Sequence, residues 1–174
     1  MKKLIEAAEI KEAVHKLGRE IEEWYQGEPL TILGVLTGSV ILLSDLVRAV
    51  ELPLKIGLIQ ASSYRGTSTT RGELIINESL IPNVEGRHVL LLDDIFDTGH
   101  TLQKLIPIIE NRKARSVRTA VLLWKAERTE VDFAPDHHCF KIPNEFVVGY
   151  GLDYNDEYRH LPYIAALEPD EIDA

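Results

Sequence analysis

One stretch of the sequence decides the fold that it predicts: residues 88–101, which read HVLLLDDIFDTGHT. Its first five residues are nearly all apolar, as expected of a strand that is covered on both faces. Three carboxylates and a Thr-Gly-His-Thr segment follow, and they lead into apolar residues at helical spacing. The stretch therefore predicts a buried strand, a polar loop and a helix. Pro107 is expected to kink or shorten that helix.

Strand-like and helix-like runs alternate on both sides of this stretch. Apolar runs predict strands over residues 31–36, 56–61, 117–124 and 146–148, and helical spacing predicts helices over residues 10–25 and 41–50. Strands that alternate with helices imply right-handed crossovers and a mostly parallel, twisted sheet flanked by helices. The predicted fold class is therefore α/β, and 174 residues suit a single domain.

The composition is acidic, with 19 Lys and Arg against 28 Asp and Glu and a formal net charge of −9. This balance argues against binding to nucleic acid or to an anionic membrane surface, because both need a basic face. Four of the acids lie in a C-terminal tail, residues 168–174, and three more lie in the central stretch. Any phosphate ligand would therefore have to be held by Mg²⁺, by backbone N–H groups and by a few placed cations.

The single cysteine, Cys139, excludes an intrachain disulfide and fits a reducing, cytoplasmic location. It follows His137 and His138, but three adjacent residues lack the spaced ligand pairs of a metal site. A strand or loop without a metal is therefore expected there. Glu6 and Glu9 interrupt the N-terminal apolar residues, which argues against a signal peptide. No run approaches the roughly 18 apolar residues of a membrane span.

Each predicted strand runs into polar, charged or Gly-containing residues. These are residues 37–39, 62–66, 93–101 and 149–153, together with Lys125. In parallel sheets, ligands bind at the carboxyl ends of the strands. The convergence of these segments on one edge predicts a binding site there.

The segment from Asp93 to Thr101 carries the most chemical information. The first N–H groups of the predicted helix point outward and can hold a phosphate, while Gly99 allows close approach and Thr98 and Thr101 add hydroxyl donors. Carboxylates beside a phosphate repel it unless a cation lies between them, and Mg²⁺ is one solution. The competing interpretation is an Asp-rich helix cap. Three Asp with Thr-Gly-His-Thr after an apolar strand favour the binding site.

Residues 93–101 closely resemble the phosphoribosyl diphosphate (PRPP) signature of the type I phosphoribosyltransferases. Other segments resemble the hypoxanthine-guanine branch of that family: residues 36–39 its pyrophosphate loop, 63–68 the start of its lid, and Lys125 with residues 146–155 its purine pocket. Arg159 follows at the expected distance. The resemblance covers about residues 30 to 165. It implies a core over about residues 30–135 and a small hood formed by about residues 1–28 and 136–167.

The resemblance implies transfer of ribose 5-phosphate from Mg-bound PRPP to N9 of hypoxanthine or guanine in purine salvage. Asp93 and Asp94 would hold the ribose hydroxyls, with or without Mg²⁺, and Asp97 would be the general base at purine N7. The backbone of Asp97, Thr98, Gly99, His100 and Thr101 would hold the 5-phosphate. His100 stands where some relatives have Lys, which matters little if the grip is by the main chain.

The remaining roles that the resemblance implies concern the purine and the pyrophosphate. Lys125 would donate to the 6-oxo group, Phe146 would stack on the base and Val147 would present its backbone to the purine edge. Asp153 would hold a second Mg²⁺ that carries pyrophosphate, and Arg159 would neutralise pyrophosphate charge. Without the resemblance, Lys125 would be interpreted as a solvated lysine, Phe146 as core, and Arg159 as part of a surface ion pair.

Thr37, Gly38 and Ser39 would bind pyrophosphate, and Thr37 replaces a Lys that some relatives carry. In the family, the peptide bond before this position is often a non-proline cis bond, which implies the same for Leu36–Thr37. Ser63 and Tyr64 would belong to a lid that closes over the reacting centre and excludes water. A plain surface loop is the competing interpretation of that segment.

Several rival functions remain open at the level of sequence. These are a xanthine- or adenine-preferring transferase, a non-catalytic RNA-binding regulator on the same fold, and a phospho-acceptor signalling domain. Lys125 and the Phe146 segment favour 6-oxopurines, the net charge opposes RNA, and the Asp pair follows the third strand where a phospho-acceptor needs it after the first. Relatives form dimers and tetramers, so a homodimer or homotetramer is expected.

Overall fold

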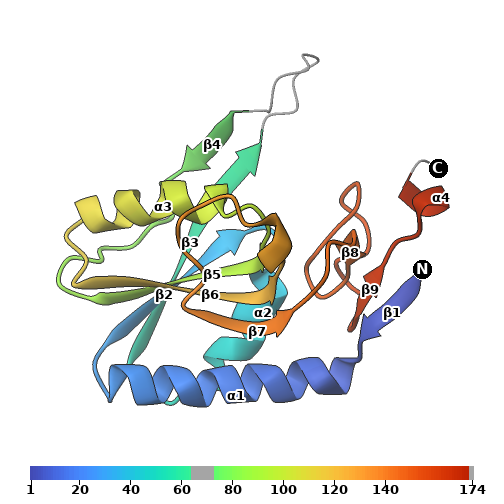
Figure 1. The fold of residues 1–174 in the computed structure, drawn as a ribbon. Coiled ribbons are helices and arrows are strands. Elements are labelled where there is room, and N and C mark those ends of the chain that lie inside the picture. Colours follow the sequence, from blue (N-terminus) through green and yellow to red (C-terminus); the bar gives the residue numbers. More distant parts are fainter. Residues whose placement is uncertain (64–72, 173–174) are drawn as a thin grey trace.

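The central sheet of the computed structural model, which describes residues 1–63 and 73–172, has six strands in the order β4-β3-β2-β5-β6-β7 (Figure 1). The strands are β2 (Leu30–Leu36), β3 (Leu54–Ser63), β4 (Leu74–Asn77), β5 (His88–Phe96), β6 (Ser116–Trp124) and β7 (His137–Lys141). All neighbouring pairs are parallel except β3 with β4. This arrangement confirms the predicted α/β fold with its mostly parallel sheet.

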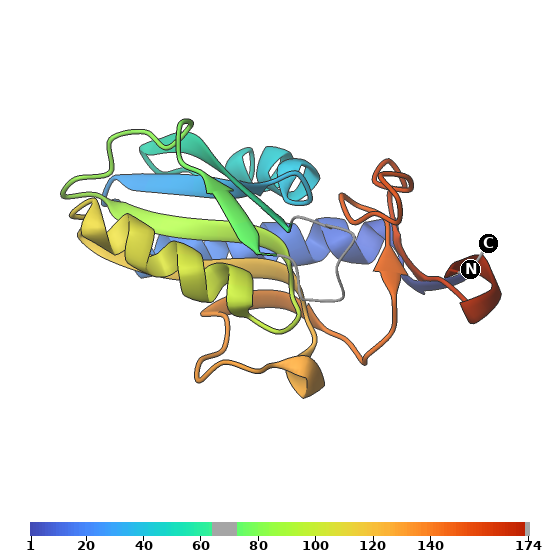
Figure 2. The same ribbon diagram turned by 90° about the horizontal axis from the view of Figure 1, so that it is seen from above.

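The helices cover both faces of this sheet, as Figures 1 and 2 show. Helices α1 (Ala7–Tyr25) and α2 (Val40–Val47) lie on one face, and α3 (His100–Asn111) lies on the other. Residues of β5 alternate between the two cores: Leu90 and Leu92 face α1 and α2, whereas Val89 and Leu91 face α3. The continuous apolar run of β5 follows from this burial on both sides.

Helix α1 buries the apolar residues whose spacing in the sequence predicted it. Its buried residues include Ile10, Val14, Leu17 and Ile21, which recur every three or four positions on one face. Each fully buried aliphatic side chain contributes about 1.5–3 kcal/mol. The helix begins with a capping box, in which the side chain of Glu9 accepts the backbone N–H of Glu6 at 2.8 Å.

A separate, smaller sheet joins the two ends of the chain. It has the order β1-β9-β8, with β1 (Lys2–Ile5), β9 (Ile164–Ala166) and β8 (Val147–Val148), all antiparallel. The short helix α4 (Pro169–Ile172) follows β9, and Met1 pairs with Glu171 at 2.7 Å. The two ends of the described chain therefore lie side by side (Figure 2).

One expectation about these elements was wrong, and one of the two effects expected of Pro107 does not occur. The run 146–148 was expected to be a fifth strand of the main sheet, but β8 belongs to the small sheet. A short apolar run has the same pattern in either sheet, so periodicity cannot assign it. Helix α3 is not shortened at Pro107 but continues to Asn111. Burial of Leu105 and Ile109 offsets the cost of about 3 kcal/mol for an interior proline.

The strand β5 is also longer than predicted. It extends to Phe96, so Asp93 and Asp94 are strand residues and not loop residues. Asp93 is registered with Val121, and Phe96 with Trp124, on the neighbouring β6. The carboxylates are therefore fixed by the ladder of the sheet itself. Within residues 1–63 and 73–172, no helix has both the length and the apolar character needed to cross a membrane.

Candidate active site

A pocket of about 300 Å³ opens at the carboxyl ends of the central strands. The residues after β2 and the end of β5 form its walls, and residues of the turns after β8 complete it. Among the predicted site residues, its lining includes Thr37, Gly38, Asp93, Asp94, Asp97, Thr98, Gly99, Thr101, Asp153 and Arg159. The predicted edge of the sheet is therefore where these residues meet.

Asp93 and Asp94 both line this pocket. Asp93 is 8% exposed, and its Oδ1 accepts the backbone N–H of Asp94 at 2.9 Å. Burial, followed by the nearby Asp94 carboxylate, raises the pKa of Asp93 well above its usual value. Burial also raises the pKa of Asp94, which the Arg159 charge opposes. Two desolvated carboxylates of this kind favour a diol or a cation between them.

Gly38 provides the space that the Asp94 carboxylate occupies. A Cβ at position 38 would lie 1.9 Å from Oδ2 of Asp94, so only glycine permits this contact. The same segment contains the cis peptide bond Leu36–Thr37, which confirms the bond that the resemblance implied. The hydroxyl of Ser39 is buried and donates to the carbonyl of Val35 at 2.7 Å. Ser39 therefore contributes structure here, and its hydroxyl does not face the pocket.

Asp97 is held between two cations from the segment after β6. Arg128 Nε donates to Oδ1 of Asp97 at 2.6 Å, and Lys125 Nζ lies 3.7 Å from Oδ2. Lys125 is only 7% exposed. Its burial lowers its pKa, and the Asp97 carboxylate opposes that effect. A carboxylate and an ammonium at this spacing can address two neighbouring polar atoms of one ligand.

The segment expected to bind the 5-phosphate lies where β5 passes into α3. Gly99 is the N-cap residue of α3 with φ +90°, a conformation that favours glycine. The first N–H groups of the helix, from His100 onward, have no intrahelical acceptor and can bind an anion. The side chain of His100 instead pairs with Glu130, with 2.7 Å between Nε2 and Oε2. A contribution of His100 to phosphate binding would therefore come from its backbone.

Asp153 and Arg159 come from the turns that follow β8. Arg159 Nη2 lies 3.0 Å from Oδ1 of Asp153, and Nη1 donates to the carbonyl of Gly151 at 2.7 Å. Gly151 has φ +103°, and a Cβ there would lie 2.1 Å from the carbonyl oxygen of Gly38. The turn therefore packs directly, backbone on backbone, against the segment expected to bind pyrophosphate.

The residues predicted for the purine lie outside the lining of the 300 Å³ pocket, apart from Asp153. Phe146 is 43% exposed and contacts Tyr154 edge to face, with 5.5 Å between ring centroids. The carbonyl of Phe146 accepts the N–H of Leu167 at 2.9 Å. Because such bonds alternate along antiparallel strands, the N–H and C=O of Val147 face the open side of edge strand β8.

The lid residues are only partly described. Ser63 is the last residue of β3, where it is registered with Leu74 of β4. Tyr64 lies outside the described residues, so its predicted role remains a prediction.

Two residues of the site were not predicted from the sequence. Arg128 contacts Asp97, and Glu130 is linked to the phosphate loop by its side chain at His100 and by its backbone N–H, which donates to Thr98 at 3.0 Å. Both belong to residues 125–130, which pass beside residues 96–100. Nothing in the local pattern Lys-Ala-Glu-Arg-Thr-Glu distinguishes them from solvated charges.

The carboxylates of the pocket suit a hard cation that is coordinated partly by the protein and partly by a bound ligand. Within the described ranges, no group of three or more His, Cys, Asp or Glu side chains is arranged to hold a metal ion. Mg²⁺ commonly uses only one or two carboxylates, together with waters and substrate phosphates. The buried carboxylate of Asp93, the partly buried one of Asp94 and the pocket-lining Asp153 fit that mode.

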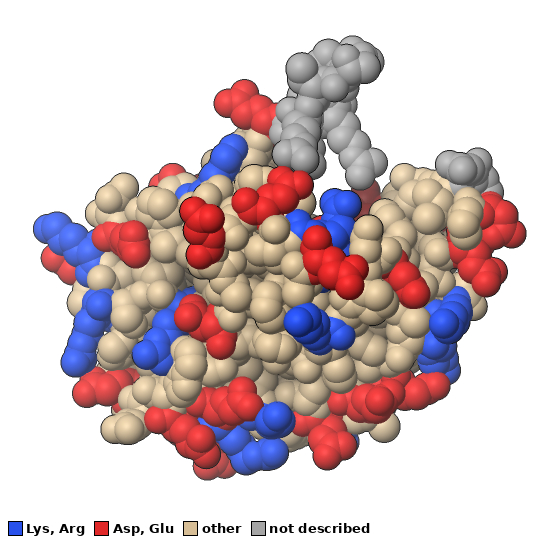
Figure 3. Space-filling model, in the orientation of Figure 1, with Lys and Arg blue, Asp and Glu red and all other residues tan. Residues whose placement is uncertain are grey.

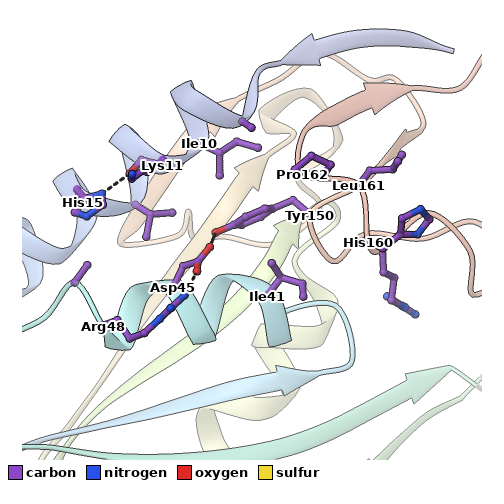
Figure 4. Close-up of a pocket in the computed structure, with 14 residues that line it drawn as sticks. Ile10, Lys11, His15, Ile41, Asp45, Arg48, Tyr150, His160, Leu161 and Pro162 are labelled. Atoms are coloured by element: carbon purple, nitrogen blue, oxygen red, sulfur yellow. Dashed lines mark hydrogen bonds and ion pairs between the residues drawn. The ribbon is translucent and has the colours of Figure 1, made fainter.

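A larger pocket of about 560 Å³ lies apart from the carboxylates, between α1, α2 and the turns after β8 (Figure 4). Its lining includes Ile10, Ile41 and Pro162, and the hydroxyl of Tyr150 donates to Asp45, which also pairs with Arg48. Burial and Asp45 raise the pKa of Tyr150. The two pockets share only Arg159. We assign the chemistry to the smaller pocket, because the carboxylates and the helix N-terminus are there.

The face seen in Figure 3 carries acidic and basic side chains interspersed among uncharged ones. The Lys and Arg side chains of its described residues stand in separate groups and not in one stripe. Cations near the pocket are instead individually placed, as Lys125, Arg128 and Arg159 show.

Known proteins resemble this chain in sequence and in overall fold. Residues 2–155 match the phosphoribosyl transferase domain family. The chain is 41% identical over 167 residues to the hypoxanthine-guanine phosphoribosyltransferase of Streptococcus pneumoniae strain R6, covering 96% of this chain and 93% of that protein. A crystal structure of a hypoxanthine phosphoribosyltransferase from Staphylococcus aureus has a TM-score of 0.90 and 38% identity, covering 97% of this chain and 92% of that one. A ternary substrates complex of a mutant hypoxanthine phosphoribosyltransferase from Trypanosoma cruzi also has a TM-score of 0.90, with 36% identity and coverage of 99% and 97%.

Proposed function

This chain belongs to the phosphoribosyl transferase family, and we propose that it is the purine salvage enzyme that transfers a 5-phosphoribosyl group from PRPP to hypoxanthine or guanine. The observation that carries the proposal is the arrangement of Asp97 and Lys125, 3.7 Å apart, beside the Asp93–Asp94 pair and the N-terminus of α3. A 6-oxopurine and a sugar phosphate need these groups together.

The transfer forms one bond and breaks another. N9 of the purine attacks carbon 1 of the ribose, and the bond from carbon 1 to pyrophosphate oxygen breaks with its electron pair leaving on pyrophosphate. The proton on purine N7 passes to the carboxylate of Asp97. Lys125 donates to the 6-oxo oxygen, which neighbours N7 on the same edge of the base. The product is a purine nucleotide whose base is uncharged, because N7 has lost its proton.

The chain's own groups prepare PRPP for this step. The carboxylates of Asp93 and Asp94 accept hydrogen bonds from the ribose hydroxyls, and the backbone from Asp97 to Thr101 receives the 5-phosphate at the start of α3. The backbone N–H of Gly38 and the guanidinium of Arg159 receive pyrophosphate, whereas the N–H of Ser39 donates to the carbonyl of Val35 at 3.3 Å. Asp93, Asp94 or Asp153 would hold Mg²⁺, which would supply positive charge to stabilise the leaving pyrophosphate.

The direct test is a spectrophotometric assay with PRPP, Mg²⁺ and one of hypoxanthine, guanine, xanthine or adenine. We expect nucleotide formation with hypoxanthine and guanine. The absence of product with both would refute the proposal, and product with xanthine alone would favour the xanthine-specific alternative. Replacing Lys125 with Gln should lower kcat/KM for hypoxanthine by about 10- to 100-fold, the value of a hydrogen bond to a charged group. An unchanged ratio of hypoxanthine to adenine turnover would contradict its selective role.

We also propose that the protein works in the cytoplasm as a homodimer or homotetramer. A single cysteine, Cys139, supports a reducing location. Val40 and Ile41, at the start of α2, are 39% and 37% exposed and are candidates for a subunit contact. Light scattering on the purified protein would measure its mass, and a monomer at assay concentration would refute the assembly.

A further inference from the structure

Arg128 forms an ion pair with Asp97, and the small contribution of such a pair to folding stability does not explain why it is there. Its guanidinium is 43% exposed, so its ion pair with Asp97 lies in solvent, where such pairs contribute little to folding. Yet the 2.6 Å distance between Arg128 Nε and Asp97 Oδ1 is that of a short, charge-assisted hydrogen bond. The exposed Arg128 therefore binds Asp97, the carboxylate that accepts the N7 proton in the proposed function.

The two oxygens of Asp97 are in different situations. Oδ1 is bonded to Arg128, whereas Oδ2 lies 3.7 Å from Lys125 Nζ, beyond hydrogen-bond distance. Oδ2 is therefore the oxygen available to a ligand. It also stands beside the ammonium that faces the 6-oxo group, which matches the adjacent positions of N7 and O6 on a purine.

Arg128 can hold this orientation because its own backbone is fixed on the phosphate loop. It ends the 3-10 turn η1 (Ala126–Arg128), where its N–H donates to the carbonyl of Lys125 at 3.0 Å. On one side of this turn, the N–H of Lys125 donates to the carbonyl of Phe96 at 2.9 Å. On the other side, the N–H of Glu130 donates to the carbonyl of Thr98 at 3.0 Å. The turn is thus bonded to the residues on both sides of Asp97.

From this geometry we infer that Arg128 is a positioning residue. Its bond to Oδ1 of Asp97 orients the carboxylate so that Oδ2 faces purine N7. The same bond prevents the carboxylate from rotating into a closer ion pair with Lys125. The inference rests on the proposed function. Without Arg128, the carboxylate is free to rotate and to pair with Lys125, which removes both groups from the base. Proton transfer would then suffer, while PRPP binding, which uses other groups, would not.

The test compares Arg128→Gln and Arg128→Lys with the wild type and with Glu127→Gln, an exposed charge on the same turn. Steady-state kinetics with hypoxanthine at saturating Mg²⁺ give kcat and the KM for PRPP. We expect Arg128→Gln to lower kcat roughly 10- to 100-fold, as misplacing a catalytic group by about 1 Å does, with the KM for PRPP within about twofold. Arg128→Lys should recover part of the loss, and Glu127→Gln should behave as wild type.

Combining Arg128→Gln with Asp97→Asn separates positioning from a structural role. A residue that acts through Asp97 has nothing left to position once that carboxylate is neutral, so the double variant should be no slower than Asp97→Asn alone. The inference is overturned if the two losses multiply, if Arg128→Gln equals Glu127→Gln, or if only the KM for PRPP changes. A wild-type enzyme without transferase activity would instead refute the proposed function.

Discussion

Two segments meet at the pocket, residues 93–101 and residues 146–159, and they are held by different means. The first is continuous with β5, which is buried on both faces, and with α3. The second contains the two-residue strand β8 and then passes through turns in which Tyr150, Asn155, Asp156 and Tyr158 all have positive φ. The first segment is therefore placed by neighbours in sequence, and the second by contacts with distant parts of the chain. Changes in the first should alter chemistry, and changes in the second should alter placement.

The largest effect is expected from Asp97→Asn. An amide cannot accept the N7 proton, so kcat should fall by about 10²–10⁴-fold, the usual contribution of a general base. PRPP affinity should change little, because the backbone and the Asp93–Asp94 pair remain. Steady-state kinetics and calorimetric titration with PRPP measure the two quantities, with Asp132→Asn as an exposed control. A loss confined to PRPP affinity would contradict the assignment.

The next largest effect tests the second segment through Gly151→Ala. The new Cβ would meet the Gly38 carbonyl at 2.1 Å in a backbone with φ +103°, so the turn must move away. We expect a loss of roughly 2–4 kcal/mol of stability, the sum of strain and overpacking, and a raised KM for PRPP. Gly27→Ala is a matched control, because Gly27 has φ +81° with no atom within 4 Å of the added Cβ. Equal losses in the two variants would show that the contact with Gly38 is unimportant.

A smaller effect is expected on stability, through the pH dependence that Asp93 of the first segment causes. The pKa of Asp93 is raised in the folded chain, so its stabilising contribution is fully present below the ordinary value of 3.8 and is lost as pH rises through the raised pKa. Asp93→Asn should remove this loss and make the ligand-free protein more stable at neutral pH, while impairing transfer. Urea unfolding without Mg²⁺ between pH 4 and pH 8 would measure it. A variant less stable than wild type at pH 8 would contradict the prediction.

The smallest effect is expected from His100→Ala. The side chain is bonded to Glu130 and not to the pocket, so only the backbone N–H would serve the 5-phosphate. The KM for PRPP should therefore change by less than about fivefold, since exposed pairs contribute about 0–1 kcal/mol. A change of tenfold or more would show that the His100 side chain takes part in phosphate binding.

The same contrast explains what could be predicted from the sequence. The strand, carboxylates and helix start of residues 88–101 are consecutive, and local pattern indicates all of them. The predicted helices over residues 10–25 and 41–50 correspond to α1 and α2, and the four predicted core strands to β2, β3, β5 and β6. These elements have strong apolar patterns, because each packs on a core.

The rest depends on pairings between distant residues. The strand β1 carries charged Lys2 and Lys3 and forms only because β9 lies beside it, so its pattern predicts no strand. Run 146–148 was identified as a strand, but its sheet was assigned wrongly. Arg128 was missed because a single exposed arginine becomes informative only when its distance from Asp97 is known. Tertiary structure supplies that information, and local sequence does not.

The pairing of β1 with β9 also sets an order of events during synthesis. Lys2 is registered with Ala166, so β1 leaves the ribosome well before β9 and must wait for this partner. At typical elongation rates of 5–20 residues per second, that wait is roughly 8–30 s. The strands from β2 to β7 can assemble during this time, whereas the small sheet closes at the end. A newly made chain would thus acquire its phosphate loop well before the turns that carry Asp153 and Arg159 are held in place.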